Sequence, residues 1–305
     1  MPNLRLPFAV VSLALVAAAC GSAGTASPPG STASGAPSSP PLPTGQPTTA
    51  GGVDHPTGAT DVILQLEEGG GFMPIEFNAA QTPQFTLFGD GRIIFLPLVE
   101  TFPEAGPDGI VRSIPLRTAQ LDAGQVEELL TFALGQGGLG AARDNYGNDM
   151  VTDASTATFT INAGGLNKTV AIYALGGEDP SAPDLIPRRA FKLLADRLRD
   201  FDKGGSIPTD VYVPSAYRAV LIEREGDPQA RPMAWPWPEL GIADFKANIN
   251  AAGALQFPHR RMTAEEVAVL ELGHIPGGIQ GATLEGPDGK IYTLVLRPLL
   301  PHEPI

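Results

Sequence analysis

We expect the first 58 residues to lie outside the hydrophobic core, and this division constrains what the rest of the chain can build. A single positive charge at Arg5 precedes the short apolar run 6–16, and three alanines then lead to Cys20. The run is shorter than the roughly 20 apolar residues that a membrane-spanning helix needs. A charged start, a short apolar run and small residues before a cleavage point are typical of a secretion signal. We therefore predict that residues 1–19 are a signal peptide that is removed on export.

Cys20 follows the alanines in a pattern similar to the lipobox of the lipoprotein signal peptidase, although Leu or Val is commoner where Ala17 stands. Only a thiol can be alkylated to a stable thioether carrying diacylglycerol, and the new terminal amine can then receive a further acyl chain such as palmitate. Two or three acyl chains hold a protein on a membrane durably where one is marginal. We predict lipid attachment at Cys20. The alternative is an ordinary signal peptide in which Cys20 is incidental.

Residues 20–58 consist, after the cysteine, almost wholly of Gly, Ser, Thr, Ala and Pro. Such a stretch has too few apolar side chains to offset the conformational entropy that folding removes. It is typical of a disordered, partly polyproline linker. We predict a tether that holds the remaining chain on the extracytoplasmic face of the cell membrane, or in the periplasm or at the outer membrane of an organism with two membranes.

About 245 residues remain, enough for one large core or two small ones. Because Cys20 is the only cysteine, this part has no disulfide, no cysteine nucleophile and no thiolate metal site. The net charge is −13, and only Arg5 and Asp54 are charged before residue 59. An acidic surface disfavours nucleic acid and anionic lipid over most of its area, so we predict no nucleic-acid partner. The lipid on Cys20 is the only membrane attachment that we predict.

The remaining chain carries signals for hairpins and for amphipathic helices in separate blocks. Hairpin turns are predicted at 89–91, 163–165 and 286–289, each between strand-like segments, and a further strand is predicted at 219–223. Helices are predicted after Asp122, from Pro187 and after Thr263. Blocks of strands linked by hairpins predict an α+β fold, in which helices cover one face of antiparallel sheets.

Two related subdomains are a further interpretation of this region, with an N-terminal α+β subdomain over 59–205 and a C-terminal one over 206–305. The segments 121–126 and 262–267 share a capped helix start, and each leads through glycine-rich sequence into strands. Capping boxes are common, so the similarity has two explanations, a true repeat or chance.

Catalytic and cofactor motifs are missing from the sequence. It has no Gly-x-Ser-x-Gly nucleophile elbow, no His-Glu-x-x-His motif and no glycine-rich phosphate loop. The loop 144–149, with Asp153, is rich in oxygen ligands but lacks the order of acids of an EF-hand, and we interpret it as a solvated turn. We therefore predict no metal and no cofactor.

An envelope hydrolase with a dispersed active site is an alternative function, because a catalytic triad is defined by geometry and not by sequence order. Its candidate residues are Ser155, Asp153 and the three histidines of the last fifty residues, which are His259, His274 and His302.

Two surface features are candidates for ligand or partner binding. Trp235 and Trp237, separated by proline, are suited to stack on a sugar or peptide, or to anchor a rigid segment in a core. The helix predicted from Pro187 is the one basic stretch of the chain, and it can meet an acidic partner or form salt bridges with Asp196, Asp200 and other acids. We favour salt bridges.

Four further segments of the sequence are distinctive, 70–74, 85–92, 151–156 and 297–301. In these segments the chain resembles a group of uncharacterised lipoproteins from high-GC bacteria such as actinobacteria, and the resemblance spans most of residues 61 to 301. It implies an exported lipoprotein and no particular activity. Members of the group often carry a cysteine pair in the C-terminal half, which this chain lacks, so any role of such a bridge does not transfer.

The leading interpretation is an exported, membrane-anchored lipoprotein that serves as a non-catalytic extracytoplasmic binding or interaction module for an envelope ligand or protein. Beside the hydrolase, a cell-envelope sensor or assembly factor is a further alternative, and it requires that Trp235 and Trp237 are exposed.

Replacing Cys20 by alanine should release the protein from the membrane or leave it unprocessed, because no other residue can carry the thioether. Membrane fractionation with labelling by palmitate measures the effect. Processing and anchoring of Cys20→Ala like those of the wild type would contradict lipidation at this residue.

Overall fold

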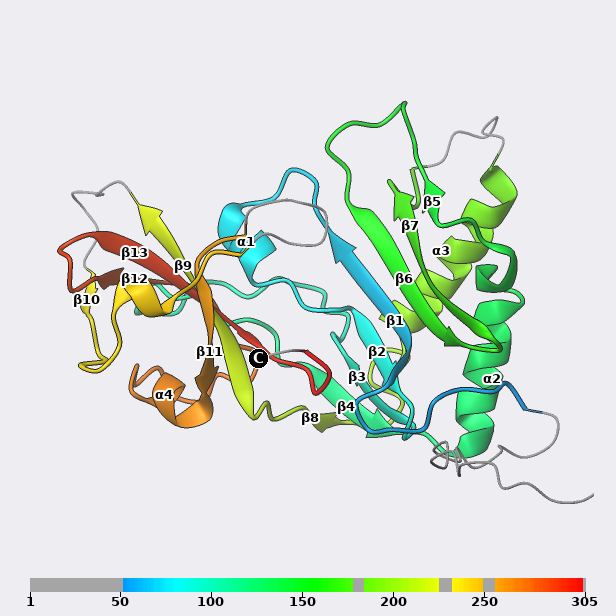
Figure 1. The fold of residues 1–305 in the computed structure, drawn as a ribbon, viewed down its shortest axis with the longest axis horizontal. Coiled ribbons are helices and arrows are strands. Elements are labelled where there is room, and N and C mark those ends of the chain that lie inside the picture. Colours follow the sequence, from blue (N-terminus) through cyan, green and yellow to red (C-terminus); the bar gives the residue numbers. More distant parts are fainter. Residues whose placement is uncertain (1–51, 178–183, 225–231, 249–255, 304–305) are drawn as a thin grey trace, which may run out of the picture. The chain divides into compact units, whose positions relative to one another are not determined.

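The computed structural model describes residues 52–177, 184–224, 232–248 and 256–303. In these ranges the chain has the predicted α+β fold, with two sheets in which antiparallel pairs dominate (Figure 1). None of the helices in these ranges is long and apolar enough to cross a membrane. Cys20 lies outside the described residues.

The first sheet has eight strands in the order β5-β7-β6-β1-β2-β3-β4-β8. Its strands are β1 (Val62–Gly69), β2 (Phe85–Phe88), β3 (Arg92–Phe95), β4 (Arg117–Gln120), β5 (Asn145–Tyr146), β6 (Thr156–Ala163), β7 (Leu166–Tyr173) and β8 (Asp210–Val211). The short β5 pairs in parallel with β7, and every other pair in this sheet is antiparallel.

The second sheet has five strands in the order β10-β12-β13-β9-β11. Its strands are β9 (Ala216–Arg224), β10 (Met233–Ala234), β11 (His259–Thr263), β12 (Ile279–Glu285) and β13 (Ile291–Pro298). Here β10 pairs in parallel with β12, and the other pairs are antiparallel.

The helices of the described ranges are α1 (Ile75–Ala79), α2 (Ala123–Leu134), α3 (Leu185–Arg199) and α4 (Ala264–Ala268), with short 3-10 turns at Leu139–Ala141 and Ile242–Asp244. In Figure 1, α2 and α3 lie on the same face of the first sheet. That face holds the largest core, which includes Phe85, Phe95 and Phe159 of the strands and Leu130 and Phe191 of the two helices.

The three predicted hairpins are confirmed. β2 and β3 pair around 89–91, β6 and β7 pair around the turn Gly164-Gly165, and β12 and β13 pair around 286–289. Gly164 and Gly165 both have positive φ, at 60° and 74°, a conformation that glycine adopts without steric cost.

The helix predictions are confirmed with one shift at an end. Asp122 and Gln125 form the predicted capping box of α2, and Thr263 and Glu266 form a second one at α4. α3 begins at Leu185, so Pro187 is its third residue and not its first. Proline is tolerated there because the first turn of a helix has no intrahelical acceptor for its N–H groups.

The similarity between 121–126 and 262–267 extends to helix capping but not to sheet topology. The hairpin after α2 joins its sheet through its first strand, because β6 pairs with β1. The hairpin after α4 joins through its second strand, because β13 pairs with β9. The order of the hairpin strands is therefore opposite in the two sheets, which argues against a simple repeat.

Val53 and Asp54, which belong to the segment predicted as tether, contact the folded part of the chain, and Val53 packs against its core. The N–H of Val53 donates to the Glu127 carboxylate at 2.7 Å, and the carbonyl of Asp54 accepts from the N–H of Gly164 at 2.7 Å. The described residues of the predicted tether thus lie against α2 and the β6–β7 turn. The rest of that segment lies outside the described residues, and its role as a tether stays a prediction.

Each sheet is completed by residues from the other half of the chain. Ala79 and Ala80, at the end of α1, pack on Val220, Ile222 and Val295 of the second sheet. The connection between β3 and β4 forms a bridge to β12, between Arg112 and Ile279. In return, Leu300 of the C-terminal segment lies in a small core with Phe88, Ile94 and Leu116 of the first half. These two small cores contain residues from before and from after position 205. The subdomain boundary predicted at 205/206 stays a prediction.

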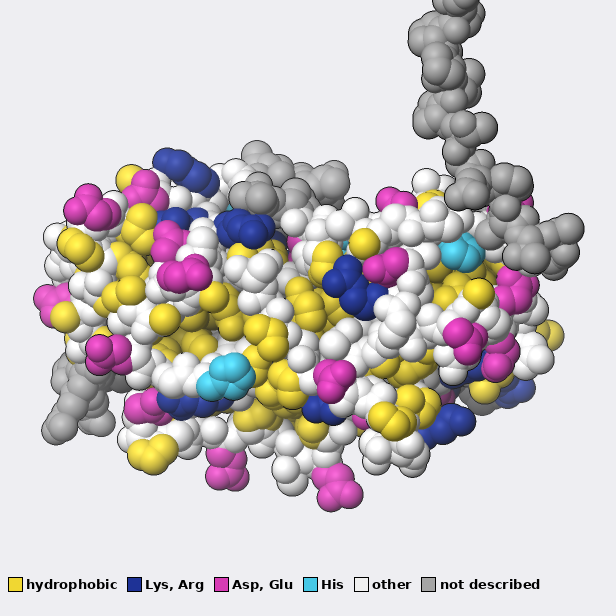
Figure 2. Space-filling model, turned by 90° about the horizontal axis from the view of Figure 1, so that it is seen from below, with side chains coloured by type: hydrophobic (Ala, Val, Ile, Leu, Met, Phe, Trp, Pro, Cys, Tyr) yellow, Lys and Arg dark blue, Asp and Glu magenta, His cyan; other side chains and the backbone are white. Residues whose placement is uncertain are grey.

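Most basic residues of α3 form ion pairs within the molecule, and the sequence favoured this interpretation. The exception among the described contacts is the exposed Arg189. Lys192 pairs with Asp196 at 2.6 Å, Arg197 pairs with Glu128 at 2.7 Å, and Arg199 pairs with Glu68. Asp200 instead accepts the N–H of Gly204. Figure 2 shows Lys and Arg side chains interspersed with Asp and Glu on the face that it draws.

Arg188 is the largest buried polar side chain of α3, with 1 % of its surface exposed. Its guanidinium donates to the carboxylate of Asp184 at 3.1 Å and to the carbonyls of Tyr173 at 3.0 Å and Tyr146 at 3.1 Å, and also to that of Gly147. A buried guanidinium with this many acceptors ties α3 to the ends of β5 and β7.

Replacing Arg188 by methionine should lower the free energy of unfolding by about 3 kcal/mol, because Asp184 and the buried carbonyls lose their donor. Denaturant unfolding measures the change. The control Arg189→Met removes the adjacent, exposed arginine and should change stability by less than about 0.5 kcal/mol. Equal stability of the two variants would contradict this role of Arg188.

Candidate functional site

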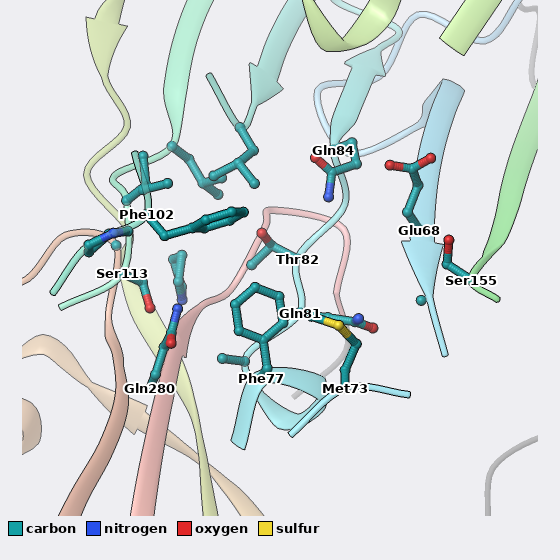
Figure 3. Close-up of a pocket in the computed structure, with 18 of the residues that line it drawn as sticks. Glu68, Met73, Phe77, Gln81, Thr82, Gln84, Phe102, Ser113, Ser155 and Gln280 are labelled. Atoms are coloured by element: carbon teal, nitrogen blue, oxygen red, sulfur yellow. The ribbon is translucent and has the colours of Figure 1, made fainter. Parts of the chain in front are cut away.

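A cavity of about 280 Å³ lies between the two sheets. Its walls come from the end of β1, the helix α1 and the loop after it, the β3–β4 connection, and the start of β12. Apolar side chains form most of the wall, and they are Met73, Phe77, Ala80, Leu96, Phe102, Pro103, Ile114, Leu116 and Pro298. Figure 3 shows Phe77, Met73 and Phe102 directed toward the same space.

Polar side chains line opposite sides of this cavity. Ser113 and Gln280 lie together on one side in Figure 3, and Glu68, Gln84 and Ser155 lie on the other. A mostly apolar cavity with a few polar groups at its sides is the usual form of a small-molecule or peptide-anchoring site.

The Ser113 hydroxyl is buried and has no hydrogen-bond partner in the part of the chain that the structure describes. Buried hydroxyls are nearly always bonded, so an exception in a cavity wall calls for an explanation. The backbone at Ser113 is held by a hydrogen bond from its N–H to the Gly278 carbonyl at 3.1 Å. The neighbouring Gly277 has room for no side chain, because a Cβ there would lie 2.3 Å from the Ser113 carbonyl oxygen. This close approach fixes the backbone at Ser113.

Large apolar side chains are exposed at the mouth of the cavity. Phe102 is 76 % exposed and Met73 is 43 % exposed, although both line the cavity. A neighbouring hollow shares Phe102 and Ser113 with the cavity and adds Val99, which is 44 % exposed. Single exposed apolar residues are ordinary, but several that converge on one cavity indicate a binding surface.

The single carboxylate in the wall is already paired. Glu68 accepts hydrogen bonds from the guanidinium of Arg199, one of them from Nε at 3.2 Å. A carboxylate held in this way is a poor candidate for a general base.

The residues named for a dispersed hydrolase site do not form a nucleophile–base pair among the described residues. Ser155 lines the cavity, and Asp153 precedes it with a positive φ of 58°. His274 lines the neighbouring hollow together with Ser113, yet the Ser113 hydroxyl has no partner. His259 Nδ1 lies 2.8 Å from the Phe257 carbonyl.

His302 belongs to a separate polar cluster on the first sheet. Its Nε2 lies 3.4 Å from the side-chain amide of Gln65, which donates to Thr86 Oγ1 at 3.1 Å. Burial lowers the pKa of His302, and the nearby Arg297 lowers it further against the opposing charge of Glu303. The Nδ1 atom is buried without a partner in the described ranges, so no carboxylate orients this imidazole.

Trp235 and Trp237 lie in and against the core of the second sheet. Trp237 is buried, and its Nε1–H donates to the Glu266 carbonyl at 2.8 Å. Trp235 is partly buried, donates to the Leu240 carbonyl at 2.7 Å, and meets Trp237 edge to face. The two tryptophans therefore anchor their segment in the core, which is one of the two alternatives that the sequence allowed. A sensor in which both indole rings are exposed is not compatible with the burial of Trp237. Ligand binding through Trp235 stays a prediction.

The interpretation of 144–149 as a solvated turn is wrong for its first part, because Asn145 and Tyr146 form β5 and Tyr146 is buried. The rest of the segment is a turn. The Asn148 side chain accepts from the Met150 N–H and donates to the Gly177 carbonyl, each at 3.1 Å. Across the described ranges no group of three or more His, Cys, Asp or Glu side chains is arranged to hold a metal ion.

Comparison with protein families, with curated proteins and with solved structures finds no match to this chain. The resemblance to actinobacterial lipoproteins therefore stays a prediction.

Replacing Ser113 by alanine should leave the free energy of unfolding unchanged or raise it by up to about 1 kcal/mol, because the hydroxyl has no bond to lose. The control Thr118→Val removes a hydroxyl that donates to the Ile93 carbonyl at 2.7 Å, and it should cost about 1 kcal/mol. Denaturant unfolding compares the two. A larger loss in Ser113→Ala than in Thr118→Val would show that the Ser113 hydroxyl is bonded within the fold.

Proposed function

We propose that the protein is an exported lipoprotein, anchored through Cys20, whose folded unit is a non-catalytic extracytoplasmic binding module. The signal, the lipidation and the tether rest on the sequence alone, since residues 1–51 lie outside the described ones. The resemblance to exported lipoproteins of actinobacteria supports the same location.

The observation that carries the binding role is the cavity, whose walls are mostly apolar and at whose mouth Met73 and Phe102 are exposed. The ligand that fits is an apolar group, which meets Phe77 and Leu116 of the cavity wall. Transfer of such a group from water into the cavity is favourable by about 25 cal/mol for each Å² of apolar surface buried.

Binding is favoured over catalysis by the state of the polar side chains around the cavity. Glu68 is neutralised by Arg199, and neither Ser113 nor Ser155 contacts a histidine among the described residues. Activation of a serine needs an adjacent base within hydrogen-bond reach. The arrangement therefore supports a module that holds a ligand without transforming it.

The uncharged fluorescent probe N-phenyl-1-naphthylamine should bind the full chain, with an increase in emission as it leaves water. Phe102→Ala should weaken this binding about fivefold to tenfold, because loss of a partly buried phenyl group costs roughly 1 to 1.5 kcal/mol of contact. Fluorescence titration measures both affinities.

The matched control is Phe72→Ala, which removes a phenylalanine that is 91 % exposed and does not line the cavity. It should bind the probe like the wild type. If Phe102→Ala and Phe72→Ala bind equally, or if the wild type binds no probe, the cavity is not the binding site.

A further inference from the structure

Three neighbouring strands of the second sheet each carry an arginine at the same level. Arg261 of β11 lies opposite Arg218 of β9, and Arg218 lies opposite Arg297 of β13. Residues that are directly opposite in antiparallel strands point to the same face, with Cβ atoms about 5 Å apart. Like charges in such positions repel each other, so a row of three guanidinium groups needs a compensating partner.

Carboxylates of the described residues compensate the positive charge of this row only in part. Arg297 forms a bidentate pair with Glu303, one bond of which joins Nη1 and Oε2 at 2.8 Å. Arg218 donates only to the neutral side-chain amide of Gln256, at 3.2 Å, and its Nε is buried without a partner. Arg261 has no ion pair in those ranges. One carboxylate therefore pairs directly with a row of three positive charges.

The titration of neighbouring groups agrees with this geometry. Burial lowers the pKa of Arg218, and the positive charge of Arg297 lowers it further. Burial acts to raise the pKa of Glu303, but hydrogen bonds and the charge of Arg297 hold it below its usual value. Burial and the charge of Glu303 raise the pKa of Glu67, against the opposing charge of Arg297.

The row borders a cleft of about 320 Å³ that is rich in hydrogen-bond donors. The cleft is lined by Arg218, Arg260, Arg261 and Arg297, by His259 and the amides of Asn248 and Gln256, and also by Leu299 and the carboxylate of Glu303. A second cleft of about 260 Å³ shares Arg218 and Arg297 and extends to Asn78 of α1. Guanidinium groups only donate hydrogen bonds, and Glu303 already accepts from Arg297, so the complementary ligand must supply acceptor oxygens.

Arg260 does not belong to this row, although it is the neighbour of Arg261. Side chains alternate along a strand, so Arg260 lies on the opposite face, where its guanidinium donates to Glu266 at 2.7 Å. The alternation of side chains along β11 therefore separates Arg260, which pairs with Glu266, from Arg261, which has no ion pair with a described residue.

We propose that this cleft binds a phosphate group, free or as a phosphomonoester, with Arg218 and Arg261 as its main ligands. A phosphate carries about −1.5 to −2 charges near pH 7 and at least three acceptor oxygens, and a guanidinium binds two of these at once. Gln256 lies where its amide N–H groups add donors, and Glu303 fixes the orientation of Arg297. In a chain of net charge −13, a cleft of this size favours a small anion over a nucleic acid. The proposal is independent of the apolar cavity.

Isothermal titration of the full chain at low ionic strength, with inorganic phosphate and with glycerol 3-phosphate, tests the proposal. At least one of them should bind saturably, and added salt should weaken the binding. The comparison of the two distinguishes free phosphate from an esterified ligand. Succinate, a dianion without a phosphate group, should bind at least tenfold more weakly.

Arg261→Gln should weaken phosphate binding tenfold or more without lowering the midpoint of thermal unfolding, because Arg261 makes no ion pair with a described residue. Arg218→Gln should weaken it at least as much. The matched control Arg189→Gln removes an exposed arginine of α3 and should bind phosphate like the wild type. Absence of saturable binding, equal binding of succinate, or equal affinity of Arg261→Gln and Arg189→Gln would each overturn the proposal.

Discussion

The inner face of the second sheet is buried by residues that precede it in the chain by more than a hundred positions. Val220, Ile222 and Val295 of this sheet pack on Ala79 and Ala80 at the end of α1. A five-stranded sheet with no helix of its own on this face would expose these side chains to water. The position of α1 follows from this burial, and α1 in turn lines the apolar cavity with Phe77 and one arginine cleft with Asn78. The apolar cavity and the smaller arginine cleft therefore depend on one contact between the halves of the chain.

Most basic side chains of this acidic molecule pair with a carboxylate nearby. The basic side chains of α3 meet carboxylates nearby, and Arg188 is buried only because carbonyl and carboxylate oxygens surround it. The arginines of β9 and β11 differ, since the described residues offer Arg218 a neutral amide and offer Arg261 no carboxylate. An unpaired charge that is partly withdrawn from water costs free energy, and an anionic ligand would offset that cost.

Local structure was accessible from the sequence wherever it rests on a short-range rule. Gly164-Gly165 between alternating segments predicted a hairpin, and Asp122 with Gln125 predicted a capping box, because both effects act within four residues. The start of α3 was misplaced by two residues, since proline fits more than one position of a first helical turn. The cavity gave no sequence signal, because Met73, Phe102, Ser113 and Gln280 are far apart along the chain and none belongs to a motif.

The sequence by itself determined the α+β class and the hairpins, and it predicts lipidation at Cys20, because spacing of apolar residues, turn chemistry and a lone thiol are local properties. Only the tertiary structure decided which residues meet. It placed Trp237 in a core, left the Ser113 hydroxyl without a partner among the described residues, and aligned Arg261, Arg218 and Arg297 across three strands. That alignment depends on the register between strands up to 79 positions apart, which long-range packing sets and local sequence does not encode.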